Sequence, residues 1–394
     1  MAVYRYLPIP SSRMGFLWAV TNIPGVAVLE FGPMGTTNFA TRHMEEAPIY
    51  STHISDSVLT FGDSAPLRRA IRELEERLAP RMIYVMQSAV TSIIGFDMES
   101  FCLELQPEVR SRLVPVTLSG LAGDYTLGMA QGMRSLVEEW LEPAVQHKAM
   151  FHILGAAIDD TRIRPDVIEL TRLMERAFGW EPGLVLPCGA TIDGLRTAGE
   201  GGVSLVLRKE ALPAARLLQE RAGIPYVEGI PVGIRGTLDW LEKVGAAIGQ
   251  APDGDFTAAE TAALRALSLP KLESVCVVSG SSMASALGRF FRQELRVPRC
   301  GTFAFEKHWQ PTEAEDAMPY GEEALDQWIA ENRPSLLLGN SVVTERDFGY
   351  PNQRVAIRKP TGIPRLDDPP VEKGFLGWQG YRNLLEAIEK TEVI

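Results

Sequence analysis

The sequence predicts an α/β protein built from three Rossmann-like, doubly wound parallel-sheet domains around a central cleft. Short buried apolar runs alternate with helical segments of about 10–15 residues along the chain, which is typical of parallel sheets with helices on both faces. The chain has 394 residues, and roughly 150 residues per domain favours two or three domains.

The first predicted domain covers residues 1–145. Its expected strands lie at residues 26–31, 82–86 and 113–117. Its expected helices lie at residues 68–78, 98–105 and 129–140. The first of these helices carries Ile71, Leu74 and Leu78 on one face, the spacing of an amphipathic helix.

The second predicted domain covers residues 146–262 and the third covers residues 263–394. Expected strands of the two domains lie at residues 149–154, 183–186, 203–207, 226–230, 274–278, 298–303, 335–338 and 355–357. Expected helices lie at residues 165–178, 211–222, 238–248, 284–295, 320–332 and 377–388. The polar stretch 249–256, rich in Gly and Pro, indicates a break between the two domains.

Composition excludes several classes of protein. The chain has 50 acidic and 39 basic residues, a net charge of −11, which argues against nucleic-acid and anionic-membrane binders. Its four cysteines are too few for a disulfide framework, and none forms a C-x-x-C pair. The N-terminus lacks the pattern of a signal peptide, and no apolar run approaches about 20 residues. We therefore expect a cytoplasmic protein.

Five turns follow expected strands, at residues 32–36, 88–95, 119–124, 279–282 and 339–341. In doubly wound folds ligands bind outside the carboxyl ends of the strands, so these turns are where a site is sought. We interpret Gly32, Gly35, Gly95 and Gly339 as backbone devices for tight strand-to-helix turns. The helix N-termini behind such turns are also able to bind an anion.

Local motifs alone do not name a reaction. The sequence contains no G-x-x-x-x-G-K-[ST], no G-x-G-x-x-G after a strand and no G-x-S-x-G. Its five histidines form no H-x-x-x-H pair. No carboxylate or histidine stands out by spacing as a general acid.

The order of several segments is more specific. They read GVAVLEFGPMGTTNF, IYSTHISDSVLTFG, MIYVMQSAVTSIIGFD, LVPVTLSGLAGDYTLGMAQGM, then VSLVLRKE, PSLLLGNS and GFLGWQGYRNLLEAI. Together they resemble the nitrogenase component 1 family over nearly the whole chain. That family includes the molybdenum–iron protein subunits, the cofactor-assembly scaffold pair, the dark-operative protochlorophyllide reductase subunits and the nickel-sirohydrochlorin reductive cyclase.

The resemblance implies a function and its parts. In the family, first-domain turns present cysteine thiolates at a subunit interface, where they hold an iron–sulfur cluster. A separate ATP-dependent iron protein docks and delivers electrons, which the cluster relays to a pocket between the three domains.

This chain departs from the family at each ligand position. Ser11, Thr36 and Ala89 stand where the resemblance places the three cysteines. Alanine cannot ligate iron, and neutral hydroxyls are poor ligands for it. We therefore expect this chain alone to hold no cluster. A single oxygen ligand from Thr36, Ser11 or Asp56, beside three cysteines of a partner, is the alternative.

The substrate side also differs from the family. The cofactor cysteine of the molybdenum–iron protein would fall near Leu207 or Arg208, and no histidine follows His308. A nitrogenase-type cofactor is therefore not expected.

Other candidates for the cleft are basic residues that follow strands, namely Arg208, Lys209, Arg358 and Lys359. They would suit a carboxylate-rich ligand such as a tetrapyrrole, and the alternative is solvated charge at strand ends. Cys188 is either a ligand or reactive thiol of the cleft or a structural cysteine.

Three hypotheses follow. The first is a subunit of a nitrogenase-like reductase that works with an ATP-dependent iron protein, a component 1-like paralogue supplying the cluster cysteines. The second is a homodimeric, cluster-free protein that binds a tetrapyrrole or another small molecule. The third is a cluster-free enzyme or scaffold.

Overall fold

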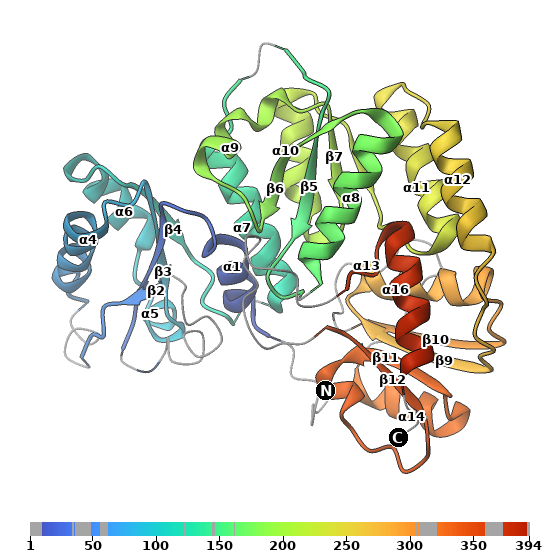
Figure 1. Ribbon diagram of the computed structural model, residues 1–394. Helices are drawn as coiled ribbons and strands as arrows, with labels where there is room; N and C mark the ends of the chain where they lie inside the picture. Colours follow the sequence, from blue (N-terminus) through green and yellow to red (C-terminus); the bar gives the residue numbers. More distant parts are fainter. Residues whose placement is uncertain are drawn as a thin grey trace.

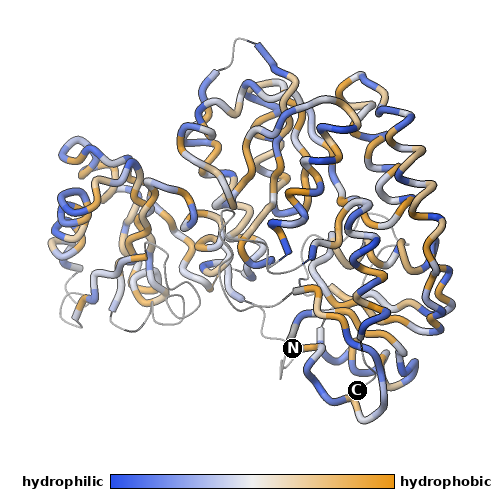
Figure 2. The backbone as a smooth tube through the Cα atoms, viewed as in Figure 1, coloured by the Kyte–Doolittle hydropathy of each residue, from blue (hydrophilic) through white to orange (hydrophobic). Residues whose placement is uncertain are grey.

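A computed structural model of the chain describes residues 10–33, 35, 49–55, 62–121, 123–143, 146–160, 162–304, 306, 321–358 and 373–391. The described chain contains three four-stranded sheets in which every strand pair is parallel (Figure 1). This confirms the predicted fold class. Figure 2 shows apolar residues along the strands and polar residues on the outer helices.

The first sheet has the order β2-β1-β3-β4. Its strands are β1 (Val26–Phe31), β2 (Ile49–Ser51), β3 (Met82–Gln87) and β4 (Arg112–Val116). β1 and β3 are buried at every position, as expected of strands covered on both faces. One face packs on α4 (Ala65–Leu78) and α6 (Met98–Leu105), which η1 (Gln106–Glu108) follows, and the short α5 (Ala89–Ile93) follows β3.

Two buried helices, α1 (Ser12–Val20) and α7 (Tyr125–Trp140), cover the other face of this sheet. They cross so closely that a Cβ added at Gly128 would lie 1.7 Å from the carbonyl oxygen of Ser12. A Cβ at Gly15 would lie 1.8 Å from the carbonyl oxygen of Tyr125. The same helices pack against the second sheet, so they join the two sheets through one apolar core (Figure 1).

The second sheet has the order β6-β5-β7-β8. Its strands are β5 (Met150–Ala156), β6 (Glu181–Pro187), β7 (Val203–Val206) and β8 (Tyr226–Glu228). Its helices are α8 (Ile163–Phe178), α9 (Ile192–Arg196), α10 (Leu212–Ala222) and α11 (Gly233–Ile248), with short turns η2 (Thr197–Glu200) and η3 (Lys209–Ala211).

The third sheet has the order β10-β9-β11-β12. Its strands are β9 (Ser274–Ser279), β10 (Arg299–Ala304), β11 (Leu336–Asn340) and β12 (Gln353–Arg358). Its helices are α13 (Ser281–Arg289), which continues into the π-helical turn η4 (Phe290–Glu294), α14 (Glu322–Asn332) and α15 (Ser341–Thr344).

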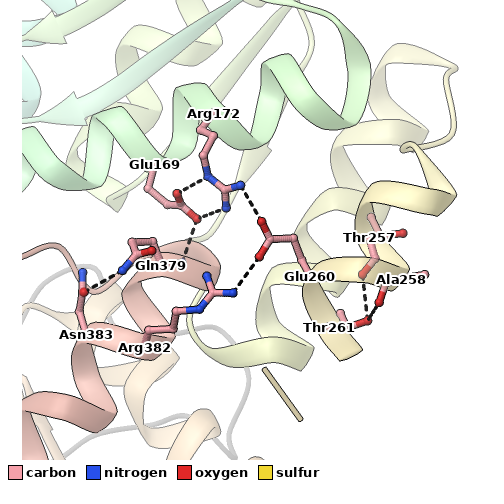
Figure 3. Close-up of polar contacts among 9 residues, drawn as sticks. All are labelled: Glu169, Arg172, Thr257, Ala258, Glu260, Thr261, Gln379, Arg382 and Asn383. Carbon is pink, nitrogen blue, oxygen red and sulfur yellow. Dashed lines mark hydrogen bonds and ion pairs between the residues drawn. The ribbon is translucent and has the colours of Figure 1, made fainter. Parts of the chain in front are cut away.

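The C-terminal helix α16 (Gly377–Lys390) packs on α8 and on α12 (Gly254–Arg265). Arg172 of α8 donates to Glu169 and, at 2.8 Å, to Glu260 of α12, and Arg382 of α16 donates to Glu260 at 3.1 Å (Figure 3). The backbone N–H of Gln379 also donates to Glu169 at 3.0 Å. These polar contacts therefore hold α16 against α8 and α12.

The predicted break at residues 249–256 is only partly free of regular structure, because α12 begins at Gly254. Asp253 caps that helix by accepting the backbone N–H of Phe256 at 2.8 Å. The domain bounds at residues 145 and 262 stay a prediction.

None of the helices in the described part of the chain has both the length and the apolar character that a membrane span requires. The cytoplasmic location stays a prediction.

Candidate functional site

The strand orders place a switch point in each sheet, between β1 and β3, between β5 and β7, and between β9 and β11. At a switch point the chain leaves neighbouring strands toward opposite faces, which opens a crevice at their carboxyl ends. The segments after these strands are therefore where side chains for binding or chemistry gather.

At the first switch point the turns after β1 and β3 touch. A Cβ added at Gly32 would lie 2.6 Å from Cβ of Ser88, so only glycine fits there. Ser88 caps α5 by accepting the backbone N–H of Thr91 at 3.2 Å, which makes Ala89 the first residue of that helix. Gly120, with φ +88°, lies against Ser11, the residue that precedes α1.

A buried ion pair connects these turns. Arg13 of α1 contacts Glu30 of β1, and their side chains are 13% and 1% exposed. Gly32 lies against the same carboxylate, and Gly120 lies against Arg13. Burial lowers the pKa of Arg13 to about 10, which leaves the guanidinium charged at neutral pH. Sequence reasoning missed this pair, although a glutamate inside the apolar run VAVLEF signals a charge that needs a buried partner.

The donors at the first switch point do not fit an iron–sulfur cluster. The described side chains offer a hydroxyl at Ser11, a methyl group at Ala89 and the Arg13–Glu30 ion pair, whereas such clusters are held by thiolates. Thr36 and Asp56 lie outside the described residues. Among the described residues no group of three or more His, Cys, Asp or Glu side chains is arranged to hold a metal ion.

Apolar side chains are exposed at this edge of the first sheet. They include Ile93, 75% exposed, Leu121, 65% exposed, and the less exposed Val90 and Ile94. Ile93, Val90 and Ile94 belong to α5 and the turn that ends it, after β3. Leu121 belongs to the loop after β4. We call these four residues the apolar edge. Several exposed apolar side chains at one edge of a sheet mark a candidate surface for binding another protein.

The second and third switch points face one another across a small cavity of about 70 Å³, which we call the central cavity. The residues around it come from the segments that follow β5, β7, β9 and β10 and from the start of α8, and include Asp160, Asp166, Arg208, Glu210, Ser281 and Glu306. Most of its charged side chains are carboxylates.

Arg208 lines the central cavity, but its charge is compensated. Its guanidinium donates to both oxygens of Asp159, at 2.8 and 3.1 Å, and to Glu210 at 2.8 Å. The guanidinium carbon also lies 6.0 Å from the centre of the Tyr125 ring. The cavity therefore does not present Arg208 as an uncompensated cation for a carboxylate-rich ligand.

Glu306 is the side chain of the central cavity best suited to proton transfer. It is 1% exposed, accepts the backbone N–H of Ser281 at 2.5 Å and accepts the hydroxyl of Tyr125 at 3.2 Å. Burial and the nearby carboxylate of Glu210 raise the pKa of Glu306 to about 7. A carboxyl group that titrates near neutral pH is able to donate a proton under physiological conditions.

Sequence reasoning missed Glu306, although it lies two residues after β10 and the rule that selected the other turns applies to it. Asp166 is a second buried carboxyl of this cavity, and burial and the nearby Asp160 raise its pKa to about 8. It accepts the backbone N–H groups of Phe375 and Leu376 at 2.8 and 2.9 Å, so its contacts are those of a structural cap.

The remaining predicted residues are spread over several places. Lys209 lines a larger groove beside the central cavity. Cys188 is buried in the apolar core shared by the first two sheets, and burial raises the pKa of its thiol. Arg358 ends β12, its side chain is outside what the structure describes, and Lys359 lies outside the described residues.

Of the glycines predicted at turns, Gly35 and Gly95 have a positive φ, whereas Gly339 lies in a strand. Gly35 and Gly95 have φ of +96° and +75°, which favours glycine. Gly339 lies in β11, where an added Cβ would be 3.1 Å from Cβ of Val343.

The residues predicted for cluster binding and those predicted for the cleft lie in different places. Ser11 and Ala89 lie at the first switch point, whereas Arg208 lines the central cavity.

The family model described as nitrogenase component 1 type oxidoreductase matches residues 11–391. The chain belongs to this family. The resemblance seen in the order of the sequence segments is confirmed.

Among curated relatives, a light-independent protochlorophyllide reductase subunit of Chloroflexus aurantiacus is 26% identical over 350 residues, covering 82% of this chain and 63% of the relative. The nitrogenase iron-molybdenum cofactor biosynthesis protein NifE of Nostoc sp. is 26% identical over 223 residues, covering 55% of this chain and 45% of the relative. The chain thus spans less than two thirds of the length of these relatives.

A solved structure of nitrogenase Cp1 at pH 6.5 has the same fold, with a TM-score of 0.77 at 16% identity, over 99% of this chain and 93% of that one.

Proposed function

We propose that this chain is a subunit of a nitrogenase-like reductase complex. It pairs with a component 1-like paralogue, and the complex receives electrons from an ATP-dependent iron protein. The iron–sulfur ligands come mainly from the paralogue. The observation that carries the proposal is the apolar edge. It lies at the carboxyl edge of the first sheet, where the family places its cluster ligands and where this chain lacks thiols.

Burial of the apolar edge in a complex supplies a driving force for pairing. Covering apolar surface contributes about 25 cal/mol of binding free energy per Å². Ile93 therefore contributes more than the less exposed Val90 and Ile94. Central, well-packed apolar contacts contribute most of the binding free energy in protein interfaces.

Glu306 is the proton donor that we assign to the complex. Reduction of an organic double bond consumes two protons together with two electrons, so a reductase needs an acid beside its substrate. Glu306 is partly protonated near pH 7, and the hydroxyl of Tyr125 and the backbone N–H of Ser281 hold its carboxyl group in place.

The Arg13–Glu30 ion pair favours a second candidate. A charged pair fills space beside the predicted ligand positions, as expected of a chain that has lost the cluster. In that case the protein is a cluster-free homodimer that binds a tetrapyrrole-like molecule or acts as a scaffold, and the apolar edge joins two copies of this chain.

Co-purification tests the pairing. The chain is co-expressed anaerobically with a tagged component 1-like paralogue that carries the three cysteines, and the complex is measured by size and by stoichiometry. We expect a complex that Ile93→Asp abolishes. Leu103→Asp is the matched control, because Leu103 is 78% exposed on α6, away from the apolar edge.

The outcomes separate the two candidates. Capture by the paralogue that Ile93→Asp removes and Leu103→Asp leaves intact supports the reductase subunit. A homodimer that ignores the paralogue and is broken by Ile93→Asp supports the cluster-free protein. A monomer that binds neither contradicts both candidates.

A further inference from the structure

Two carboxyl groups in the central cavity, those of Glu210 and Glu306, have different partners. Glu210 lies in η3, after β7, and Glu306 lies two residues after β10, so they come from the second and third sheets. Both line the cavity, which measures about 70 Å³, so the two side chains lie close together. Neighbouring carboxyl groups disfavour a state in which both are ionised, because like charges repel. One of the two is therefore expected to hold a proton near neutral pH.

Glu210 is the member of the pair that the fold holds as a carboxylate. Its side chain is 4% exposed and accepts the guanidinium of Arg208 at 2.8 Å. A direct contact with a cation favours the charged form of a carboxyl group more than a neutral donor does. Glu306 accepts two neutral donors, the backbone N–H of Ser281 at 2.5 Å and the hydroxyl of Tyr125 at 3.2 Å. The proton of the pair is therefore expected on Glu306.

Arg208 is fixed by contacts on several sides. Its Nη1 donates to both oxygens of Asp159, its Nη2 donates to Glu210, and its guanidinium carbon lies 6.0 Å from the centre of the Tyr125 ring. Gly155, with φ +96°, leaves room for it, since an added Cβ would lie 2.6 Å from Cγ of Arg208. The planar fork of a guanidinium is able to hold two carboxylates in fixed directions. One side chain therefore orients Glu210 and packs beside Tyr125.

The hydrogen bonds of Glu306 select the oxygen that carries its proton. Oε1 accepts the backbone N–H of Ser281, a group that only donates, so the proton of the neutral acid belongs on Oε2. Oε2 lies 3.2 Å from the hydroxyl oxygen of Tyr125, which is able to donate to the carboxylate and to accept from the acid. This hydrogen bond therefore reverses when Glu306 titrates, and both protonation states keep a partner.

Several titratable or charged side chains lie around Glu306. They are Tyr125 of α7, Asp159 and Asp160 after β5, Asp166 of α8, and Arg208 and Glu210 after β7. Burial and the carboxylate of Glu210 raise the pKa of Glu306 to about 7. Asp166 also titrates near neutral pH, because burial and Asp160 raise its pKa to about 8. A titration therefore has to separate the signals of Glu306 and Asp166.

We propose that Arg208 and Glu210 are positioning residues for Glu306. Arg208 keeps Glu210 ionised, and the negative charge of Glu210 keeps the proton on Oε2 of Glu306 until a base enters the central cavity. Transfer of that proton leaves Glu306 as a carboxylate, while Glu210 and Arg208 stay charged. Arg208 therefore sets the strength of an acid and does not bind the acidic groups of a ligand. This role rests on the proposed function, in which Glu306 is the proton donor.

Infrared titration of the purified full-length chain tests the proposal through the carbonyl stretching bands of protonated carboxyl groups. Glu306→Gln and Asp166→Asn identify the bands of these two residues by removing them. We expect Glu210→Gln to lower the pH at which Glu306 titrates by about one pH unit or more, because a neighbouring like charge is lost. Asp159→Asn is the matched control, since it removes the same charge from the other side of the same guanidinium, and its effect should be less than half as large. Glu210→Asp keeps the charge and should restore most of the titration of the wild type.

Arg208→Gln tests the contribution of the guanidinium. Without the cation Glu210 should take up a proton near neutral pH, so we expect an additional carboxyl band that the second substitution Glu210→Gln removes. Circular dichroism shows whether this variant folds. Where it does not, the comparison of Glu210→Gln with Asp159→Asn still decides the proposal.

An unchanged titration of Glu306 in Glu210→Gln would overturn the proposal, as would an equal shift in Asp159→Asn or a folded Arg208→Gln variant without the additional band. If Glu306 titrates near pH 7 in all variants, its assignment as the proton donor stands and only the positioning role fails. If Glu306 gives no titrating band between about pH 5 and 8, both the positioning role and the proton donor fail. Neither result changes the pairing through the apolar edge, which co-purification measures separately.

Discussion

Replacing Arg13 with leucine removes the cation that compensates the buried carboxylate of Glu30. The side chain of Glu30 is 1% exposed, so the remaining charge has little access to water. Loss of one partner of a buried ion pair costs about 3–5 kcal/mol, because the other charge stays desolvated and unpaired. That is a large part of a typical free energy of unfolding of about 5–15 kcal/mol.

The double variant Arg13→Leu with Glu30→Leu removes both charges and leaves apolar groups in their place. We expect it to recover most of the stability lost in either single variant, since well-packed apolar replacements of a buried pair are often neutral. Urea unfolding followed by tryptophan fluorescence measures the cycle, since Trp18 lies on the same helix, α1, as Arg13. Arg68→Leu is the control and should cost less than about 1 kcal/mol, because its partners Glu104 and Glu108 are exposed.

Single variants that each cost less than about 1 kcal/mol would refute the reasoning, because they would show that water already solvates the pair. A double variant as unstable as the sum of the two single variants would also refute it, since the two charges would then not interact.

Three further predictions concern stability. Because burial raises the pKa of Glu306 to about 7 and of Asp166 to about 8, the folded chain holds protons that the unfolded chain has released, so stability falls as pH rises from about 5 to 8. Asp166→Asn, which keeps an oxygen for both backbone N–H groups, should flatten that fall in urea titrations across pH; an unchanged slope contradicts it. Glu260→Gln should weaken both arginine contacts and raise hydrogen exchange in α16 by about tenfold, and unchanged exchange would show that packing alone holds the helix. Gly128→Ala should lower the free energy of unfolding by about 2–3 kcal/mol, because the new Cβ forces α1 away from α7. Gly236→Ala is the control and should raise the free energy of unfolding by about 0.5–1 kcal/mol, because the space around Gly236 is open. Equal effects of the two substitutions would contradict the close crossing of the helices.

The sheets could be predicted because parallel strands are buried on both faces and stand out as short apolar runs, as VAVLEF and MIYVM do. The same burial hid α1. Nearly every residue from Ser12 to Val20 is buried, so the helix lacks the one-sided apolar stripe by which helices are recognised. The start of α12 lies inside the predicted break because its first residues are polar and include glycine, yet Asp253 at that point is a helix cap.

The chemistry of the site could be predicted less far. Once the family is recognised, the residues Ser11 and Ala89 show that two thiols are lost. They do not show which interactions take the place of the thiols. The contact of Arg13 with Glu30 joins a helix to a strand, and the pKa of Glu306 depends on Glu210 across the central cavity. Such distances between segments are fixed by the packing of the sheets and leave no local pattern in the sequence.

The most direct test of the central claim is the content of iron and acid-labile sulfide in the anaerobically purified chain, alone and in complex with a cysteine-bearing paralogue. The account predicts no cluster in the chain alone and a cluster in the complex that survives Ser11→Ala. A full cluster in the isolated chain, lost on Ser11→Ala and retained on Cys102→Ala, would contradict it.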